Sequence, residues 1–276
     1  MRTALKLLAL LFLLPAALAE TPAPPAGLPF VPPAEGQPLG SFRLRRDERS
    51  LLVEQYAPQS AGGQFRTNVP GCEEGIRLST VYGPDPYAVV TRVGEHTEIV
   101  SRIVLARRPE GDGGADTLTM FDGSLGVDDG YCPVEVSESG LQQVFIRQGR
   151  TVASGTHLVY DNETGLAELT GPVRLRRAAS GDSPEITANA ASLTFDIETE
   201  LSTLEGDVVV SSGKRLSHAD SLVLDEKEGL ARLSGSPARS SEGDNAIRGE
   251  QLLYYLDSDD VIVSGGAGGT LRLDLP

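Results

Sequence analysis

Tryptophan is absent from this 276-residue sequence, and histidine occurs only three times, as His96, His157 and His218. No Gly-x-Ser-x-Gly motif provides a nucleophile that one of these histidines could activate. The many Asp and Glu pairs fall in turn-like segments, where nothing distinguishes a catalytic pair from solvated charge. The sequence therefore predicts no enzymatic activity, no catalytic residues, no metal site and no cofactor.

Positive charge is also scarce. The chain has 24 Lys and Arg against 39 Asp and Glu, which gives a net charge of −15. A strongly acidic surface repels phosphate backbones, so we expect no nucleic-acid partner. The acidic residues are scattered through turns, which is typical of a solvated surface rather than of an acidic tail.

Long apolar runs are missing except at the N-terminus. Arg2 and Lys6 precede an apolar stretch from Leu7 to Leu14, and Ala17-Leu18-Ala19 has the form of a cleavage site. This arrangement predicts a signal peptide at residues 1–19, the alternative being an uncleaved anchor. No cysteine follows the stretch, which argues against a lipoprotein anchor, and no later segment is apolar enough to cross a membrane. We therefore expect an exported protein, and the family resemblance described below implies the periplasm.

Residues 20–39 are rich in proline, which favours an extended tether over a packed core. We expect the fold to begin at residue 40. The chain has only two cysteines, Cys72 and Cys132, and an even pair in an exported chain predicts a disulfide. The alternative, a pair of metal ligands, is disfavoured because no histidine lies near either cysteine.

The second half of the chain contains a repeat. Four units each begin with an apolar Leu (Leu158, Leu193, Leu222 and Leu252), and a Gly follows 13 residues later in every unit. Successive units start 35, 29 and 30 residues apart, and three of them carry Asp three residues after the first Leu. Self-similarity at this period indicates a stacked architecture.

Within each unit, apolar and polar residues alternate, as expected for strands with one buried and one wet face. We expect hairpin turns at residues 162–165, 197–200, 226–229 and 258–260, and we see no amphipathic helix. The fold class is thus all-β, an elongated antiparallel β-jelly roll of stacked hairpin repeats. Residues 151–276 would form the repeats. Residues 40–150 would form the N-terminal part of the same roll, with a separate small domain as the alternative.

The repeat resembles that of the LptA/OstA family of periplasmic lipopolysaccharide-transport proteins. The residues that carry the resemblance are 152–161 with Leu169-Thr170-Gly171-Pro172-Val173, then 186–195, 218–222 and 248–252. The similarity spans roughly residues 152–265, while residues 40–150 do not show the repeat clearly.

The resemblance implies a jelly roll with a hydrophobic groove that holds the acyl chains of lipopolysaccharide or another envelope glycolipid or phospholipid. Its partners would be related β-jelly-roll transport proteins, or the protein itself, end to end. The alternative function is a structural or adhesive β-stack of the cell envelope. The residues predicted to line the groove, which could instead simply fill a core, are Leu158, Tyr160, Leu169, Val173, Leu175, Leu193, Phe195, Leu204, Val208, Leu222, Leu224, Leu252 and Tyr254.

Two small basic clusters, at residues 43–46 and 174–177, could meet lipid phosphates. We expect them instead to occupy solvent-facing strand positions. The closing glycines of the repeat are expected on the apolar face, where a small residue leaves room for a neighbouring side chain or an acyl chain.

Overall fold

The computed structural model describes residues 38–46, 49–56, 59–84, 88–111, 116–181, 183–256 and 261–264. The predicted signal peptide, most of the predicted proline-rich tether, the expected turn at 258–260 and residues 265–276 lie outside this set. The domain boundaries inferred from the sequence therefore stay predictions.

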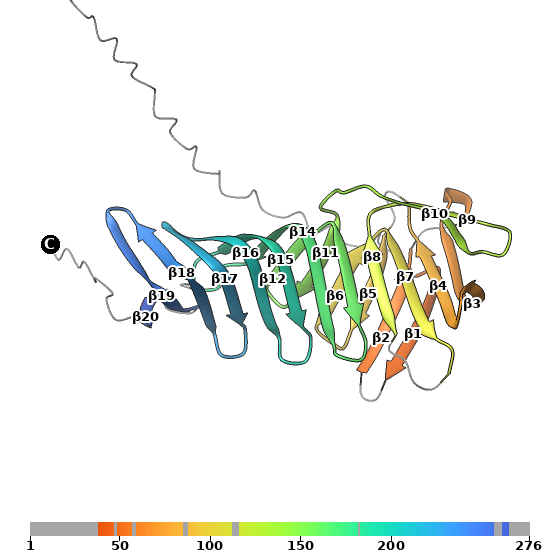
Figure 1. Cartoon of the computed structure of the whole chain (residues 1–276), viewed down its shortest axis with the longest axis horizontal. Coiled ribbons are helices and arrows are strands. Elements are labelled where there is room, and N and C mark those ends of the chain that lie inside the picture. The colour runs from red at the N-terminus through yellow and green to blue at the C-terminus, as the bar shows by residue number, and fades with distance from the viewer. Residues whose placement is uncertain are drawn as a thin grey trace, which may run out of the picture.

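The described residues form an all-β structure, elongated along the direction in which the strands stack (Figure 1). Eighteen strands belong to one antiparallel sheet, and β9 and β10 form a separate two-stranded sheet. The predicted all-β, jelly-roll-like fold class is thus confirmed. In the described part of the chain, no helix has the length and apolar character needed to cross a membrane. The strands are β1 (Gly40–Arg46), β2 (Arg49–Gln55), β3 (Gln64–Glu73), β4 (Ile76–Tyr82), β5 (Val89–Val93), β6 (Thr97–Ser101), β7 (Ile103–Pro109), β8 (Thr117–Phe121), β9 (Gly123–Val127), β10 (Pro133–Glu138), β11 (Val144–Gln148), β12 (Thr151–Gly155), β13 (His157–Asp161), β14 (Leu166–Arg177), β15 (Ile186–Asp196), β16 (Leu201–Ser212), β17 (Arg215–Asp225), β18 (Leu230–Glu242), β19 (Asn245–Tyr255) and β20 (Val261–Ser264).

Up to β13, the strands form two layers. Layer 1 contains β1, β2, β5, β6, β11 and β12 in that order of pairing, and layer 2 contains β3, β4, β7, β8 and β13. The chain makes a hairpin in one layer and then passes to the other. Apolar side chains of both layers meet in one shared core, so the layers face each other.

From β14 onward, single long strands span both layers. The first half of β14 pairs with β13 in layer 2, and its second half pairs with β12 in layer 1. Strands β15 to β19 continue as an antiparallel meander, and the pairing register shifts near the middle of each neighbouring pair. Each register shift marks a β-bulge, where a strand bends from one layer into the other.

The closing glycines of the first three repeat units lie at these bends, and the fourth, Gly265, lies outside the described residues. Gly171 and Gly206 have φ angles of +88° and +83°, and a Cβ would lie 2.2 Å from Thr156 Oγ1 and 2.7 Å from Ala191 Cβ, respectively. In the third unit, the bend contains Gly235 and a cis peptide bond before Pro237. The expectation that these glycines leave room on the apolar face was wrong. Gly206 is exposed and Gly171 and Gly235 are half-buried, so they serve the backbone conformation rather than the interior.

The recurrent aspartates organise the hairpin turns of layer 2. Asp161 Oδ1 accepts hydrogen bonds from the backbone N–H groups of Glu163 and Thr164, at 2.7 and 2.9 Å. Asp196 Oδ1 does the same for residues 198 and 199, and Asp225 Oδ1 accepts from residue 228. These are Asx-type turns, in which a short carboxylate replaces backbone partners. The predicted turns at 162–165, 197–200 and 226–229 are all present between strands.

At the N-terminal end of the sheet, a hairpin folds over the outer face of layer 2. Leu125 of β9 buries against Ile103, Leu105 and Phe121, which point away from the shared core. Strand β9 occupies residues 123–127, and Arg102 separates β6 from β7.

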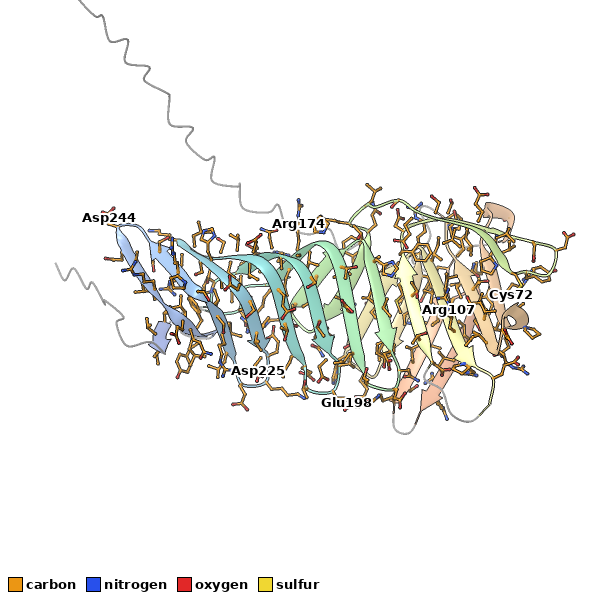
Figure 2. All side chains as sticks on the ribbon, viewed as in Figure 1. Cys72, Arg107, Arg174, Glu198, Asp225 and Asp244 are labelled. Carbon is orange, nitrogen blue, oxygen red and sulfur yellow. A yellow bond between two sulfur atoms is a disulfide. The ribbon has the colours of Figure 1, made fainter. Side chains whose placement is uncertain are left out.

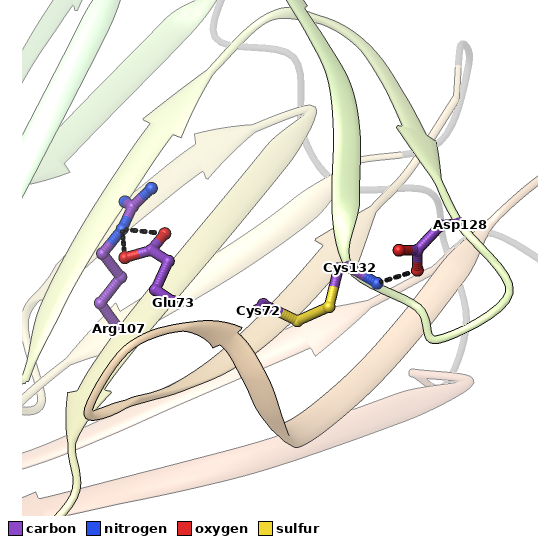
Figure 3. Close-up of a disulfide and its surroundings, with 5 residues drawn as sticks. All are labelled: Cys72, Glu73, Arg107, Asp128 and Cys132. Carbon is purple, nitrogen blue, oxygen red and sulfur yellow. Dashed lines mark hydrogen bonds and ion pairs between the residues drawn. A yellow bond between two sulfur atoms is a disulfide. The ribbon is translucent and has the colours of Figure 1, made fainter.

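The predicted disulfide between Cys72 and Cys132 is present and attaches this hairpin to β3 (Figure 3). Beside it, Arg107 Nε donates to Glu73, and Asp128 Oδ1 accepts the backbone N–H of Cys132 at 2.8 Å. The edge strand β3 is therefore held to β7 by an ion pair and to the hairpin by a covalent bond.

Candidate functional site

All thirteen residues predicted to line a groove belong to the interior cluster, and none is more than 8% exposed. The structure brings together four of them, Leu175, Leu222, Leu224 and Tyr254, around an apolar pocket. The other nine pack elsewhere in the same core. Which of these residues contact a ligand stays a prediction.

The pocket lies between the two layers in the C-terminal half of the roll. Its cavity has a volume of about 20 Å³, room for about one water molecule, and is partly open to solvent. Besides the four residues above, its lining includes nine others, of which the alternation also places Val210 and Leu233 on the inner face. These are Pro184, Ile186, Val210, Ser212, Ser217, Ala231, Leu233, Tyr255 and Leu256. The lining is mostly aliphatic, and burying an alkyl chain in such a pocket contributes about 0.8 kcal/mol per CH₂.

Towards the N-terminus, the layers are joined along the edge that carries the layer-2 turns. Arg49 of β2 donates to the carbonyl oxygens of Asn162 and Glu163 and pairs with Glu198, with Nε 2.5 Å from the carboxylate. Glu198 and Asp225 lie along this edge in Figure 2. One arginine of layer 1 thus holds two successive turns of layer 2.

The same region contains Tyr160, whose side chain is fully buried. Burial raises the pKa of Tyr160 to about 12, since the phenolate would lose its hydration. Its hydroxyl donates to Asn162 Oδ1 at 3.4 Å. Tyr160 was predicted to line the groove, and here it packs in the core and is not among the residues that line the pocket.

A second bridge joins the layers at the end of the pocket. Arg177, the last residue of β14, donates through Nε to both carboxylate oxygens of Glu226 at 3.1 Å. The hydroxyl of Thr151 donates to the same carboxylate. The Arg177 side chain is 2% exposed. The expectation that all arginines at 174–177 face solvent was therefore wrong for Arg177, which continues the inward alternation of Val173 and Leu175.

A third bridge is formed by Ser217 and Tyr254, whose hydroxyl oxygens are 2.7 Å apart. Ser217 Oγ also donates to Ser240 Oγ. The guanidinium of Arg215 lies over the Tyr254 ring, 5.6 Å from its centroid. Tyr254 thus contributes both an apolar ring to the pocket and a polar tip to the contact between layers.

The two ends of the roll present different strand edges. At the C-terminal end, β20 pairs with residues 251–254 of β19, whereas no described strand pairs with the outer side of residues 245–249. At the N-terminal end, the layer-2 edge β3 is interrupted by two register shifts and fixed by the disulfide. The layer-1 edge β1 at that end has a regular register, and no described strand pairs with its outer side. An unpaired, regular edge can accept a strand from another chain, and a bulged edge resists it.

Taken together, the two-layered antiparallel arrangement with an apolar pocket between its layers defines the class of elongated β-jelly-roll proteins. The comparison with protein families is consistent with this class. Residues 143–230 match the family model described as "LptA/(LptD N-terminal domain) LPS transport protein". The resemblance inferred from the repeat is thereby confirmed for about a third of the chain, from β11 to the start of β18. No curated protein matches the chain.

The family match begins upstream of the first repeat unit and ends before the fourth. It includes most of the pocket lining and both partners of the bridge between Arg177 and Glu226. The matched family is a transport family whose members act at the cell envelope. Lipid transport is therefore the function with which the properties of the pocket are compared.

Proposed function

We propose that this protein is an exported, non-enzymatic carrier of envelope lipid, with acyl chains of lipopolysaccharide or a related lipid held between the layers of the roll. The apolar pocket within the family-matched region carries this proposal. An acyl chain needs an apolar path with few polar groups, and the lining from Leu175 to Leu256 would provide one when the two layers move apart.

The position of the pocket supports a role in transfer. The bridges at Arg49 and Arg177 join the layers on its N-terminal side, while the unpaired part of β19 lies at the C-terminal end. A chain bound in the pocket would therefore be near the end at which another β-jelly roll could extend the sheet. Such an arrangement favours handover at the C-terminal end of the molecule.

The charges at the two ends favour a related partner over a second copy. Arg248 is exposed on the unpaired part of β19, opposite Arg239 of β18. Arg43 and Arg45 are exposed on β1, the layer-1 edge at the other end. End-to-end pairing of two copies within layer 1 would bring these arginines together, which is unfavourable for neighbouring strands. The partner that fits is a jelly roll with an acidic first strand.

Lipid binding is tested by titrating the purified protein with an uncharged, environment-sensitive acyl probe. Saturable binding is expected, and Ala231→Phe should abolish it because Ala231 lines the pocket. Arg232→Phe is the matched control, since Arg232 is the next residue on β18 and is exposed. An absence of co-purifying lipid together with an absence of probe uptake by the wild type would refute the carrier proposal.

The alternative, a structural or adhesive β-stack, makes a different prediction for the same preparation. It requires concentration-dependent end-to-end assembly without lipid. Light scattering across a range of protein concentrations distinguishes the two functions, because the carrier proposal, with arginines at both layer-1 edges, expects no self-assembly.

A further inference from the structure

The pocket ends at a charged position. Along β14, Arg177 follows Leu175 on the same face, and along β17 and its turn, Glu226 follows Leu224 on the same face. Both leucines line the pocket. Two residues of a strand span about 6.6 Å, so the guanidinium and the carboxylate lie one row beyond the apolar lining, within reach of a group attached to a chain in the pocket.

The guanidinium of Arg177 has more N–H donors than its described partners satisfy. Arg177 Nη1 is buried and has no hydrogen-bond partner among the described residues. Arg150 Nη1 is in the same condition. The turn that holds Arg150 is adjacent to the end of β14, because the Arg150 carbonyl oxygen accepts the backbone N–H of Ala178 at 3.1 Å.

The acidic partner is the more exposed member of the bridge. Glu226 belongs to the turn between β17 and β18, and its side chain is 19% exposed, against 2% for Arg177. Its carboxylate accepts from Arg177 and Thr151 and has solvent beside it. Rotation of Glu226 towards solvent would leave the guanidinium of Arg177 free to bind another anion.

We propose that Arg177, with Arg150, binds the anionic headgroup of a lipid whose acyl chain occupies the pocket, and that the headgroup displaces Glu226. The ligand is an amphiphile whose phosphate or carboxylate lies close to the head of its chain. The guanidinium fork matches both groups, and charge-assisted hydrogen bonds are strong where water is excluded. This inference rests on the proposed lipid-carrier function and adds selectivity for charge to it.

The test compares two ligands that differ only in the headgroup. Dodecyl phosphate and dodecanol, both below their aggregation limits, compete with the uncharged acyl probe on the full mature chain. For the wild type, we expect dodecyl phosphate to displace the probe at a concentration lower by roughly tenfold or more. Glu226→Gln should increase this preference, because it removes the competing carboxylate.

The variant Arg177→Gln/Glu226→Gln removes the charge without leaving Glu226 unpaired. It should bind dodecanol as the wild type does and lose the preference for the phosphate. Arg174→Gln is the control, because Arg174 is exposed on the same strand. If the double variant unfolds, Arg177→Lys replaces it; that variant keeps the charge but lacks the fork, so its preference should fall below that of the wild type.

The outcomes separate the two proposals. A wild type that binds neither the probe nor dodecanol refutes the carrier function itself. Equal displacement by dodecanol and dodecyl phosphate, or a preference that survives in the double variant, refutes only the headgroup site. Inorganic phosphate alone is the remaining arm, monitored by thermal stability. If it stabilises the wild type as strongly as dodecyl phosphate does, the site binds free phosphate, and the lipid assignment is overturned.

Discussion

In the N-terminal part of the roll, the passage from one layer to the other separates two short strands, whereas β14 to β19 each cross as a single strand. Strands β6 and β7 are divided at Arg102, and β12 and β13 at Thr156. Neither of these residues has a positive φ angle. In β14 and β16, the strand continues through a glycine in the left-handed region.

The difference explains why only one half of the chain shows a repeat. In β14 and β16, the bend is formed by a glycine with positive φ, which glycine adopts at the lowest cost. In β18, Gly235 has no positive φ, but a Cβ there would lie 2.9 Å from the backbone N of Ala238. Glycine therefore recurs at a fixed distance along β14, β16 and β18. Where one strand ends and another begins, almost any residue can occupy the break. The N-terminal half therefore has the same two-layered architecture without a periodic pattern in its sequence. This contrast also fits a family match that is confined to residues 143–230.

The largest effect that separates the two regions should come from the disulfide. The variant Cys72→Ala/Cys132→Ala opens a loop of 60 residues, which should lower the free energy of unfolding by about 4 kcal/mol in the chain-entropy model. The loss should be concentrated in β3, β4, β9 and β10. Hydrogen exchange resolved by segment measures it.

Strands β15 to β18 serve as the internal control for this variant. Their amide protection should change little, because the bends and turns that order them are local. Equal loss of protection in both regions would mean that the roll unfolds as one cooperative unit, and the contrast between the regions would then concern geometry alone.

The glycine bends provide the next test. Gly171→Ala would place Cβ 2.2 Å from Thr156 Oγ1 at a φ of +88°, so we expect a loss of about 3 kcal/mol from backbone strain and crowding together. Gly243, in the turn between β18 and β19, has a φ of +58°, and a Cβ added there would have no neighbouring atom within 4 Å. Gly243→Ala should therefore cost only about 1 kcal/mol. Chemical denaturation measures the free energy of unfolding of both variants. If both lose the same amount, the bend of the strand does not explain why glycine recurs in the repeat.

Much of the fold could be predicted from the sequence because its signals are local. Alternation places Leu169, Leu193 and Leu222 inside, and the aspartates that begin the layer-2 turns are visible as a pattern. Strand β3 gave no such signal, since it contains Pro70 and two register shifts and most of its residues are exposed or half-buried. Strand β10 is exposed along most of its length, so burial imposes no alternation on it.

The candidate site was less predictable. Inward-facing residues can fill a core or line a pocket, and the choice depends on how far apart the layers lie, which periodicity does not encode. Arg177 was assigned to solvent as part of a basic run, although its spacing from Val173 and Leu175 already placed it on the inner face. Its partner Glu226 is 49 residues away in the chain, and no local pattern connects the two.

Tyr160 tests the junction between the regions, because it lies on β13, the last short strand. Its raised pKa of about 12 means that the folded state keeps the proton between pH 10 and 12, while the unfolded state loses it. Stability is therefore fully present below pH 10 and is lost as the pH rises towards 12, by at most about 2–3 kcal/mol. Tyr160→Phe should show a shallower decline over this range in urea-unfolding experiments. The same slope in both proteins would show that Tyr160 ionises without disturbing the core.

Asp196 provides the smallest and most local test, within the region of continuous strands. Burial acts to raise the pKa of Asp196, but hydrogen bonds from Thr199 and Glu198, with the charge of Arg49, lower it overall. A depressed pKa stabilises the fold above the unfolded-state pKa, and this contribution is lost as the pH falls through the folded-state value. Asp196→Ala should cost about 1 kcal/mol at neutral pH, from the lost turn hydrogen bonds. Its difference from the wild type should shrink in acid. Asp244→Ala, at an exposed position in the turn between β18 and β19, should have a smaller effect at either pH. If the stability lost in Asp196→Ala did not depend on pH, Asp196 would stabilise the fold through packing and not through its charged carboxylate. The hydrogen bonds in the turn would then not explain why aspartate recurs in the repeat.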